Sequence, residues 1–304
     1  MAQVEKYQVR AVGNLIAHYE RRQKLNETTG KMEYVKFGNR DIDTRWSPLN
    51  YRIWPPLPME ETAIRDIYVS QELQDLFDAT GVDPEEPALD RFKRIFRDTP
   101  HATRKDLKAF CSWVISLPDE IPSERMGEFF DLCMKYCVSK YGAENIVGGW
   151  VHLDEAHRPH LHVAFVPVVT TTSTGADGST ITTRRICAKD VINRDHLRSW
   201  HGGLTSACQK VMGIENPGIE NGRTIAQGGN RTVKQMKASD KAYDRTKGKE
   251  VDRWRTKAEK ALQRAVKDRQ TETLDNVLVS ARERAEAQLK PPRDRTFTEK
   301  LQGR

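Results

Sequence analysis

The stretch IVGGWVHLDEAHRPHLHVAFVPVV, residues 146–169, contains two runs rich in β-branched and aromatic residues, separated by a short polar segment. Such runs favour strands and the polar segment favours a turn, so the stretch predicts a β-hairpin. His160 and His162 are two residues apart on the second strand and therefore share one of its faces. If residues 155–159 form the turn, His152 on the first strand lies opposite His162.

The same register places Asp154 opposite His160, so that three histidines and one carboxylate share a face of the hairpin. Three converging imidazoles can bind one divalent ion and leave positions open for water or a phosphate oxygen. This donor set is typical of a catalytic metal centre, and imidazole accepts Mn, Fe, Co, Ni, Cu or Zn. The alternative is a polar hairpin that happens to be rich in histidine; for His157, in the turn, solvent exposure is the better explanation.

Strand and helix patterns on both sides of the hairpin predict an α+β fold, in which helices flank a central antiparallel sheet. The chain begins with a predicted strand at Tyr7–Val12, a Gly13-Asn14 turn and a helix from Leu15, which places His18 in the first helical turn or just before it. Further predictions are a loop at 39–51, a broken helical pattern at 75–98, a strand ending at Leu117, a helix at 123–141, a turn at 172–179, a strand within 180–192 and a helix at 194–212.

Charge is distributed unevenly along the 304 residues, whose net charge is +7. Residues 230–304 contain 21 Lys and Arg against 12 Asp and Glu, whereas the first 229 contain 29 against 31. We therefore predict a globular domain at 1–215, a Gly/Asn-rich linker at 216–232 and a basic, charged helical tail at 233–304. Such a tail is typical of contacts with a phosphate backbone, but a solvated charged helix explains it equally well.

The five cysteines form no CxxC pair and lie at no zinc-finger spacing from a histidine, which predicts free thiols in a reducing compartment. No charged-then-apolar leader opens the chain, and no apolar run approaches the roughly 18 to 20 residues that span a bilayer. We therefore expect a cytoplasmic protein without a transmembrane segment.

At the hairpin the sequence resembles the Mob/Pre (MobV) plasmid mobilisation and recombination relaxases, which belong to the HUH endonuclease superfamily. The family motif is close to H-x-D-E-x-x-P-H-x-H, and the run from His152 to His162 matches it with one extra residue before Pro159. Because that residue falls in the turn, the register of the histidines is kept. The extra residue changes the spacing between Glu155 and Pro159, so Glu155 is the residue whose position it affects.

Three more blocks resemble the family in the same order along the chain. GNLIAHYER, residues 13–21, resembles the N-terminal motif, in which the histidine at the place of His18 is the proposed nucleophile. Residues 39–51, ending in Leu-Asn-Tyr, resemble a second block, and Arg104-Lys105-Asp106 resembles a third. The resemblance spans about residues 1–235 and implies an HUH relaxase-like fold.

The resemblance implies a relaxase that nicks one strand of plasmid origin-of-transfer DNA by transesterification, remains covalently attached to the 5′ phosphate, and later rejoins the strand. His152, His160 and His162 would hold the metal, expected to be Mn, with Mg or Zn as alternatives. Asp154 would not bind the metal itself but would orient one of the ligand imidazoles. Glu155 would position or deprotonate the nucleophile.

Two residues are candidates for the nucleophile. His18 would form a phosphoramidate and Tyr51 a phosphotyrosine, and the family position favours His18. Tyr51, in a block with Trp46 and Trp54, is as easily a packing or base-stacking residue. Four basic residues are candidate DNA contacts: Arg21, Arg45, Arg104 and Lys105.

The resemblance also suggests the partners: single-stranded and hairpin origin-of-transfer DNA, a second copy of the chain bound through the C-terminal helix, and the conjugation machinery of a helper element in a bacterial host. Two other functions fit the histidine cluster. One is a metal-dependent phosphoesterase or nuclease in which water attacks, and the other is a non-catalytic DNA-binding module with a structural ion. An open three-histidine site argues against the last, because structural zinc is normally enclosed by four ligands.

Overall fold

The computed structural model describes residues 2–35, 42–56, 69–155, 158–174 and 177–219, and near the C-terminus residues 249–257, 259–260, 263–264 and 267. The chain divides into two compact units, Met1–Glu259 and Lys260–Arg304. The sheet, its helices and the histidine cluster all lie in the first unit.

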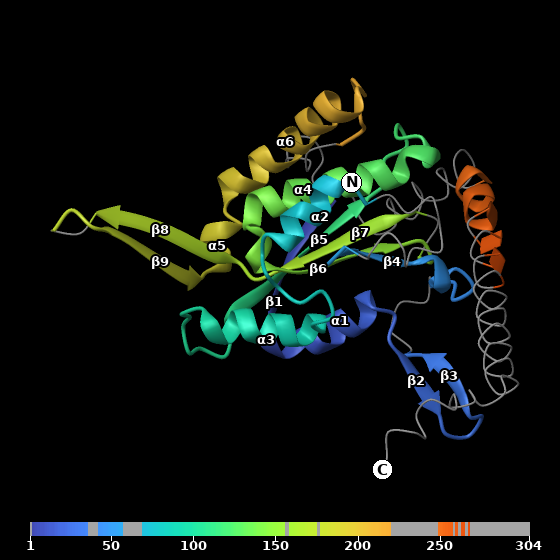
Figure 1. The fold of residues 1–304 in the computed structure, drawn as a ribbon, viewed down its shortest axis with the longest axis horizontal. Coiled ribbons are helices and arrows are strands. Elements are labelled where there is room, and N and C mark those ends of the chain that lie inside the picture. The colour runs from blue at the N-terminus through green and yellow to red at the C-terminus, as the bar shows by residue number, and fades with distance from the viewer. Residues whose placement is uncertain are drawn as a thin grey trace, which may run out of the picture. The chain divides into compact units, whose positions relative to one another are not determined.

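Five antiparallel strands form a central sheet in the order β1-β5-β7-β6-β4 (Figure 1). The predicted hairpin supplies β6 and β7, and both strands are buried along their whole length because helices cover both faces of the sheet. This confirms the predicted fold class. The strands are β1 (Ala2–Gln8), β4 (Tyr51–Trp54), β5 (Lys108–Ser116), β6 (Ile146–His152) and β7 (His160–Phe165).

Helices α1 and α3 lie on one face of the sheet, and α2, α4 and α6 lie on the other (Figure 1). The face under α1 carries a core in which Ile16 and Tyr19 of α1, Phe92 of α3 and Trp150 of β6 pack together. The helices predicted at 123–141 and 194–212 are confirmed. The helices are α1 (Val12–Tyr19), α2 (Gln71–Asp78), α3 (Ala88–Asp98), α4 (Met126–Tyr141), α5 (Ala188–Val191) and α6 (Arg194–Met212).

The N-terminal prediction was wrong in its boundaries. Strand β1 ends at Gln8 and α1 begins at Val12, so the Gly13-Asn14 pair lies inside a helix and not in a turn. His18 is consequently in the last turn of α1 instead of the first. Burial of the apolar face of this short helix against the core outweighs the roughly 1 kcal/mol that a glycine costs in a helix.

Two hairpins stand outside the central sheet: β2 (Gln23–Asn26) with β3 (Lys31–Tyr34), and β8 (Val168–Thr174) with β9 (Thr180–Ile186). The β8–β9 hairpin extends away from the sheet in Figure 1. The apolar run predicted as one strand up to residue 169 is divided at Pro167, which cannot donate a ladder hydrogen bond.

The register predicted for the β6–β7 hairpin was also wrong. His152 lies opposite His160, and Trp150 lies opposite His162. The difference is a shift of two residues, and because side chains alternate with a period of two, all three histidines still share one face. His157, predicted to be exposed in the turn, lies outside the described residues.

The loop after β6 is held by segment 42–50 and not by β7, which explains the shifted register. The backbone N–H of Leu153 donates to Oδ1 of Asn50 at 2.7 Å. The backbone N–H of Asp43 donates to the carbonyl oxygen of Asp154 at 2.7 Å. These contacts draw the chain out of the sheet before it reaches β7.

Most of the predicted linker and tail has no structural counterpart to compare, because residues 220–248 and 268–304 lie outside the described residues. Residues 249–257 are helical, and the helical tail at 233–304 as a whole stays a prediction. None of the helices in the described part of the chain has the length and apolar character needed to cross a membrane. All five cysteines are free thiols, as predicted, and four of them are buried.

Gly149 on β6 allows α4 to lie close to the sheet, on the face opposite the histidine cluster. A Cβ at this position would be 2.7 Å from Sδ of Met134 and 3.0 Å from Cγ2 of Ile53. We expect Gly149→Ala to lower the free energy of unfolding by about 1–3 kcal/mol through overpacking. A Cβ at Gly13 would meet no atom within 4 Å, so Gly13→Ala should raise it by roughly 0.4–1 kcal/mol. Urea denaturation measures both, and equal midpoints would contradict the packing argument.

Candidate metal and catalytic centre

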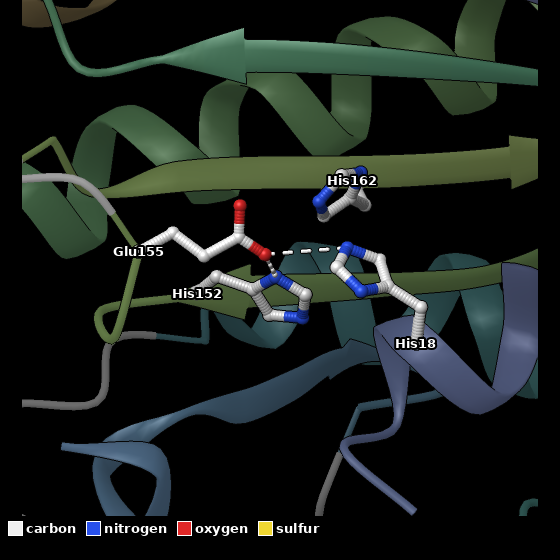
Figure 2. Close-up of side chains that lie close together, drawn as sticks. All are labelled: His18, His152, Glu155 and His162. Carbon is white, nitrogen blue, oxygen red and sulfur yellow. Dashed lines mark ion pairs between the residues drawn. The ribbon is translucent and has the colours of Figure 1, made fainter. Parts of the chain in front are cut away.

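The last turn of α1 brings His18 over the histidine face of the hairpin. In Figure 2, His18 reaches from α1, His152 from β6, His162 from β7 and Glu155 from the loop after β6, and their side chains point toward one another. One ligand atom from each lies within 4.8 Å of the others. Residues far apart in the sequence therefore form a group that can hold one metal ion.

The three hairpin histidines also converge with one another. Their ring centroids are 4.7 Å apart between His152 and His162, 5.3 Å between His152 and His160, and 4.9 Å between His160 and His162. Nε2 of His160 lies 3.1 Å from Nε2 of His162 and 3.8 Å from Oε2 of Glu155. The structure thus offers two overlapping ligand sets, one with His160 and one with His18 and Glu155.

The charge states of the cluster suit a cation. Burial lowers the pKa of His152 to about 4 and lowers that of His162 well below its ordinary value, so both rings are neutral near pH 7. Burial alone would raise the pKa of Glu155, but hydrogen bonds from His152 and His18 and the charge of His160 lower it below its ordinary range. Neutral imidazoles beside a buried carboxylate are the forms in which these groups bind metals.

Arg21 connects α1 to the carboxylates of the hairpin loop. Its side chain is 4% exposed, and its Nε and Nη2 donate to the two carboxylate oxygens of Asp154 at 2.8 and 2.9 Å. Nη1 donates to the carbonyl oxygen of His18 at 2.7 Å, and Nη2 also contacts Glu155. The backbone of Arg21 has a φ of +48°, in the left-handed region that L residues rarely adopt. That conformation ends α1 and directs the guanidinium into the loop.

The hydrogen-bond network assigns the ring proton of His18. Nη1 of Arg21 lies 3.1 Å from Nδ1 of His18. A guanidinium only donates, so Nδ1 accepts and the proton resides on Nε2. Nε2 faces Oε1 of Glu155 at 3.2 Å. One nitrogen of His18 is therefore held by a donor and the other by a carboxylate, which orients the ring.

The family model for plasmid recombination enzymes (Mob_Pre) matches residues 60–238, more than half of the chain. The chain belongs to this family. The matched segment contains the hairpin histidines and the Arg104-Lys105-Asp106 block, and it begins after His18 and Tyr51. A search of curated proteins found no match.

Solved structures with the same fold include a MobM relaxase domain (MOBV; Mob_Pre), manganese-bound and in complex with plasmid pMV158 oriT DNA at pH 6.8. It is 21% identical with a TM-score of 0.50, and the match covers 79% of this chain and 97% of that one. A second manganese-bound complex of that domain with oriT DNA, at pH 5.5, is 21% identical with a TM-score of 0.46 and covers 79% and 98%. The first match supports a relaxase-like fold for this Mob_Pre chain.

In this Mob_Pre chain Asp154 reaches a ligand imidazole through Arg21. Asp154 accepts hydrogen bonds from Arg21 and from Oγ of Ser47, the latter at 2.5 Å, and Nη2 of Arg21 lies 3.1 Å from Nδ1 of His152. The predicted role of Asp154 in orienting an imidazole stays a prediction. Arg21 was expected to bind a DNA phosphate, but Asp154 and Glu155 engage its guanidinium within the protein. We interpret Arg21 as a positioning residue, through which Asp154 acts.

Tyr51, the alternative nucleophile, lies on the far side of the sheet from the cluster. It pairs with Val151, the neighbour of His152, and because side chains alternate along a strand it points to the opposite face. It is 6% exposed, and burial raises the pKa of its phenol above the ordinary value. The sequence predicted that Tyr51 ends a loop, and outside a strand the alternation of side chains cannot predict which face of the sheet a residue occupies.

The other predicted DNA contacts of this Mob_Pre chain are exposed. Arg45 forms an ion pair with Asp43 and is 79% exposed. Arg104 and Lys105 precede β5, at the opposite end of that strand from the residue that pairs with His160. Their contact with DNA stays a prediction.

Sequence reasoning missed two residues of the centre, Tyr19 and Ser47. The ring of Tyr19 stacks on His162 at a centroid distance of 4.4 Å, and its carbonyl oxygen lies 2.8 Å from Nε2 of His152. Ser47 binds Asp154 as described above. Both lie in blocks that resemble the family, 13–21 and 39–51, but no local pattern gave either residue a role.

Proposed function

We propose that this protein is a plasmid mobilisation relaxase, which nicks one strand of origin-of-transfer DNA by metal-dependent transesterification and rejoins it. The observation that carries the proposal is His18, 3.2 Å from Glu155 and within a group of potential metal ligands. The relaxase domain that shares its fold is bound to oriT DNA and manganese. A nucleophile beside a cation site is what in-line attack on a phosphodiester requires.

The donor set fits a divalent cation such as Mn²⁺, with Mg²⁺ or Zn²⁺ as alternatives. We propose that His152, His160 and His162 hold the ion: the rings of His152 and His162 are neutral, and Nε2 of His160 is directed at Nε2 of His162. When bound, the ion would neutralise charge on the scissile phosphate. This set does not include His18, which can then act as the nucleophile.

His18 is the accessible member of the centre, with 19% of its side chain exposed against 0% for His152. In the proposed step, Nε2 of His18 attacks phosphorus as its proton passes to the carboxylate of Glu155. The bond from phosphorus to the 3′-oxygen breaks, and that oxygen takes the proton from Glu155. A phosphoramidate then joins His18 to the 5′ phosphate, and the reverse sequence rejoins the strand.

The test is to incubate the full chain and Mn²⁺ with supercoiled plasmid bearing the cognate origin, then denature the protein. The proposal expects nicked circles with covalently attached protein, and an adduct that acid hydrolyses, as expected of a phosphoramidate. Nicks without attached protein would instead support the water-using phosphoesterase. An intact plasmid with every metal would support the non-catalytic DNA-binding module.

Separate removal of His160 and His18 tests which ligand set binds the ion. We expect His160→Ala to weaken Mn²⁺ binding at least about tenfold, since even loss of a group that only orients a ligand has an effect of that size. His18→Ala should leave the affinity unchanged. Calorimetric titration of the two variants measures both affinities. The opposite ranking would make His18 a ligand and contradict its assignment as nucleophile.

The remaining proposals concern context. We propose a cytoplasmic location, a homodimer formed through the C-terminal helix, and delivery to the conjugation machinery of a helper element. The basic excess after residue 230 is the feature that motivates a role for the tail in DNA contact or self-association. Sedimentation of the full chain and of a chain ending at residue 219 would test the dimer.

A further inference from the structure

A hollow of about 370 Å³ lies next to the catalytic centre, between α1, β3, β4 and β6. Its volume is within the roughly 300–1,000 Å³ typical of small-ligand sites. Tyr19 and His152 belong to both the hollow and the centre, so whatever occupies the one is adjacent to the other. The residues that the argument uses are Tyr19, Tyr34, Asn50, Arg52 and Trp150, together with His152.

Several of the residues that line it are aromatic. The rings of Tyr19 and Trp150 are 5.3 Å apart, and Tyr19 in turn stacks on His162. Tyr34, at the end of β3, contributes a third ring from the outlying hairpin. Aromatic side chains stack with nucleobases, because every base has a π-face. Tyr34 is the most exposed of these three residues, since Tyr19 and Trp150 are each 4% exposed.

Two residues that line the hollow carry buried donors that lack a hydrogen-bond partner. Within the described part of the chain, Nδ2 of Asn50 and Nε of Arg52 are buried and have no hydrogen-bond partner. The orientation of the Asn50 amide is set by Leu153, whose backbone N–H requires the oxygen, Oδ1, as its acceptor at 2.7 Å. Arg52 carries only donors. A buried donor without a partner costs free energy, so both groups favour a ligand that brings acceptors.

We propose that this hollow binds one nucleobase of the single strand, adjacent to the scissile phosphate, and that it selects a base with two neighbouring acceptors. The inference rests on the proposed function, which places single-stranded DNA at this centre. Guanine offers N7 and O6, and cytosine offers O2 and N3. Adenine places an amino donor beside N7, and thymine places an N–H between its carbonyls. With either base, one of the two protein donors would face a donor of the base and not an acceptor.

Binding to short oligonucleotides in EDTA tests the base preference without any nicking. The full chain would be titrated into fluorescein-labelled dT12 and into the same strand with a central dC, dG or dA, with anisotropy as the readout. Because all the other bases are thymine, the strand can shift its binding register until the single different base occupies the hollow. We expect the dC or dG strand to bind roughly 5- to 150-fold more tightly than dT12 and the dA strand.

Substitutions then assign the preference to the hollow. Asn50→Asp keeps the acceptor for Leu153 but replaces the free donor with an acceptor. Because every base offers a donor beside an acceptor, the advantage of the dC or dG strand over dT12 and the dA strand should shrink in this variant. Arg52→Ala should abolish the preference for dC or dG. Arg97→Ala is the matched control, because Arg97 is an exposed arginine paired with Asp98, and it should keep the preference of the unmodified chain.

Tyr34→Ala provides a second measurement, in which the substituted residue is not buried in the core. It should weaken all four strands by about tenfold through loss of stacking. Thermal unfolding of each variant identifies any that fail to fold. Equal affinity of the unmodified chain for all four strands would overturn the proposal, as would an unchanged preference in folded Asn50→Asp and Arg52→Ala. A chain that shows the preference but never nicks overturns only the proposed function, and one that nicks without it overturns only the base pocket.

Discussion

His18→Ala is expected to abolish the covalent adduct with DNA and to reduce nicking by at least about 10⁴-fold, as removal of a nucleophile does in other enzymes. The reason is geometric: His18 is directed at the histidine face of the hairpin, held at Nδ1 by Arg21 and at Nε2 by Glu155. The measurement is single-turnover nicking of a labelled origin strand in Mn²⁺, with the adduct resolved on a denaturing gel.

Tyr51→Phe is the matched control for that experiment. Because the phenol is buried on the opposite face of the sheet, its removal should leave the rate and the acid-labile adduct within about twofold of the unmodified protein. An acid-stable adduct that survives His18→Ala and disappears in Tyr51→Phe would sink the assignment of His18. Retained Mn²⁺ binding in both variants shows that the centre itself has folded.

The second large effect concerns the buried pair between Arg21 and Asp154. Removing one partner leaves an uncompensated charge, because the two side chains are 4% and 0% exposed. We expect Arg21→Met to lower the free energy of unfolding by about 3–5 kcal/mol, and Asp154→Leu to have an effect of similar size. The double variant should lose clearly less than the sum, because the Arg21–Asp154 interaction is then absent as a whole and only the contact of Arg21 with Glu155 is lost in addition.

Urea denaturation at pH 7 without added metal measures this double-mutant cycle. Additive losses would mean that the pair does not interact in solution. Nicking adds a readout that a purely structural role would not move: Arg21 holds the ring of His18, so the double variant, although folded, should bind DNA but nick more slowly. Arg97→Ala again serves as the exposed control and should change neither quantity.

Much of the centre could be predicted from local pattern. Alternating β-rich runs around a polar turn predict a hairpin, and a spacing of two residues places His160 and His162 on one face whatever the turn does. That rule explains why the prediction of a shared face holds although the predicted register was wrong. A slip of two residues returns every side chain to the same face of the sheet. The same alternation would have excluded Tyr51, had β4 been recognisable as a strand.

The boundary of α1 shows where local pattern stops being sufficient. Gly13-Asn14 is a common turn signal, yet the pair is helical because the apolar side of the segment packs under the sheet. Burial of a few side chains contributes more than the local preference of a single glycine. That difference moves His18 to the end of the helix, directly above the hairpin.

The sequence by itself determined the fold class, the shared face of the three histidines and the family resemblance, because each depends on spacing within one short segment. Only the tertiary structure decided which groups surround His18. Arg21 and Asp154 are 133 positions apart, and no local period relates them. Their contact follows from the packing of α1 on the sheet and from the loop held by segment 42–50. The same packing leaves Asn50 and Arg52 facing a hollow beside the nucleophile.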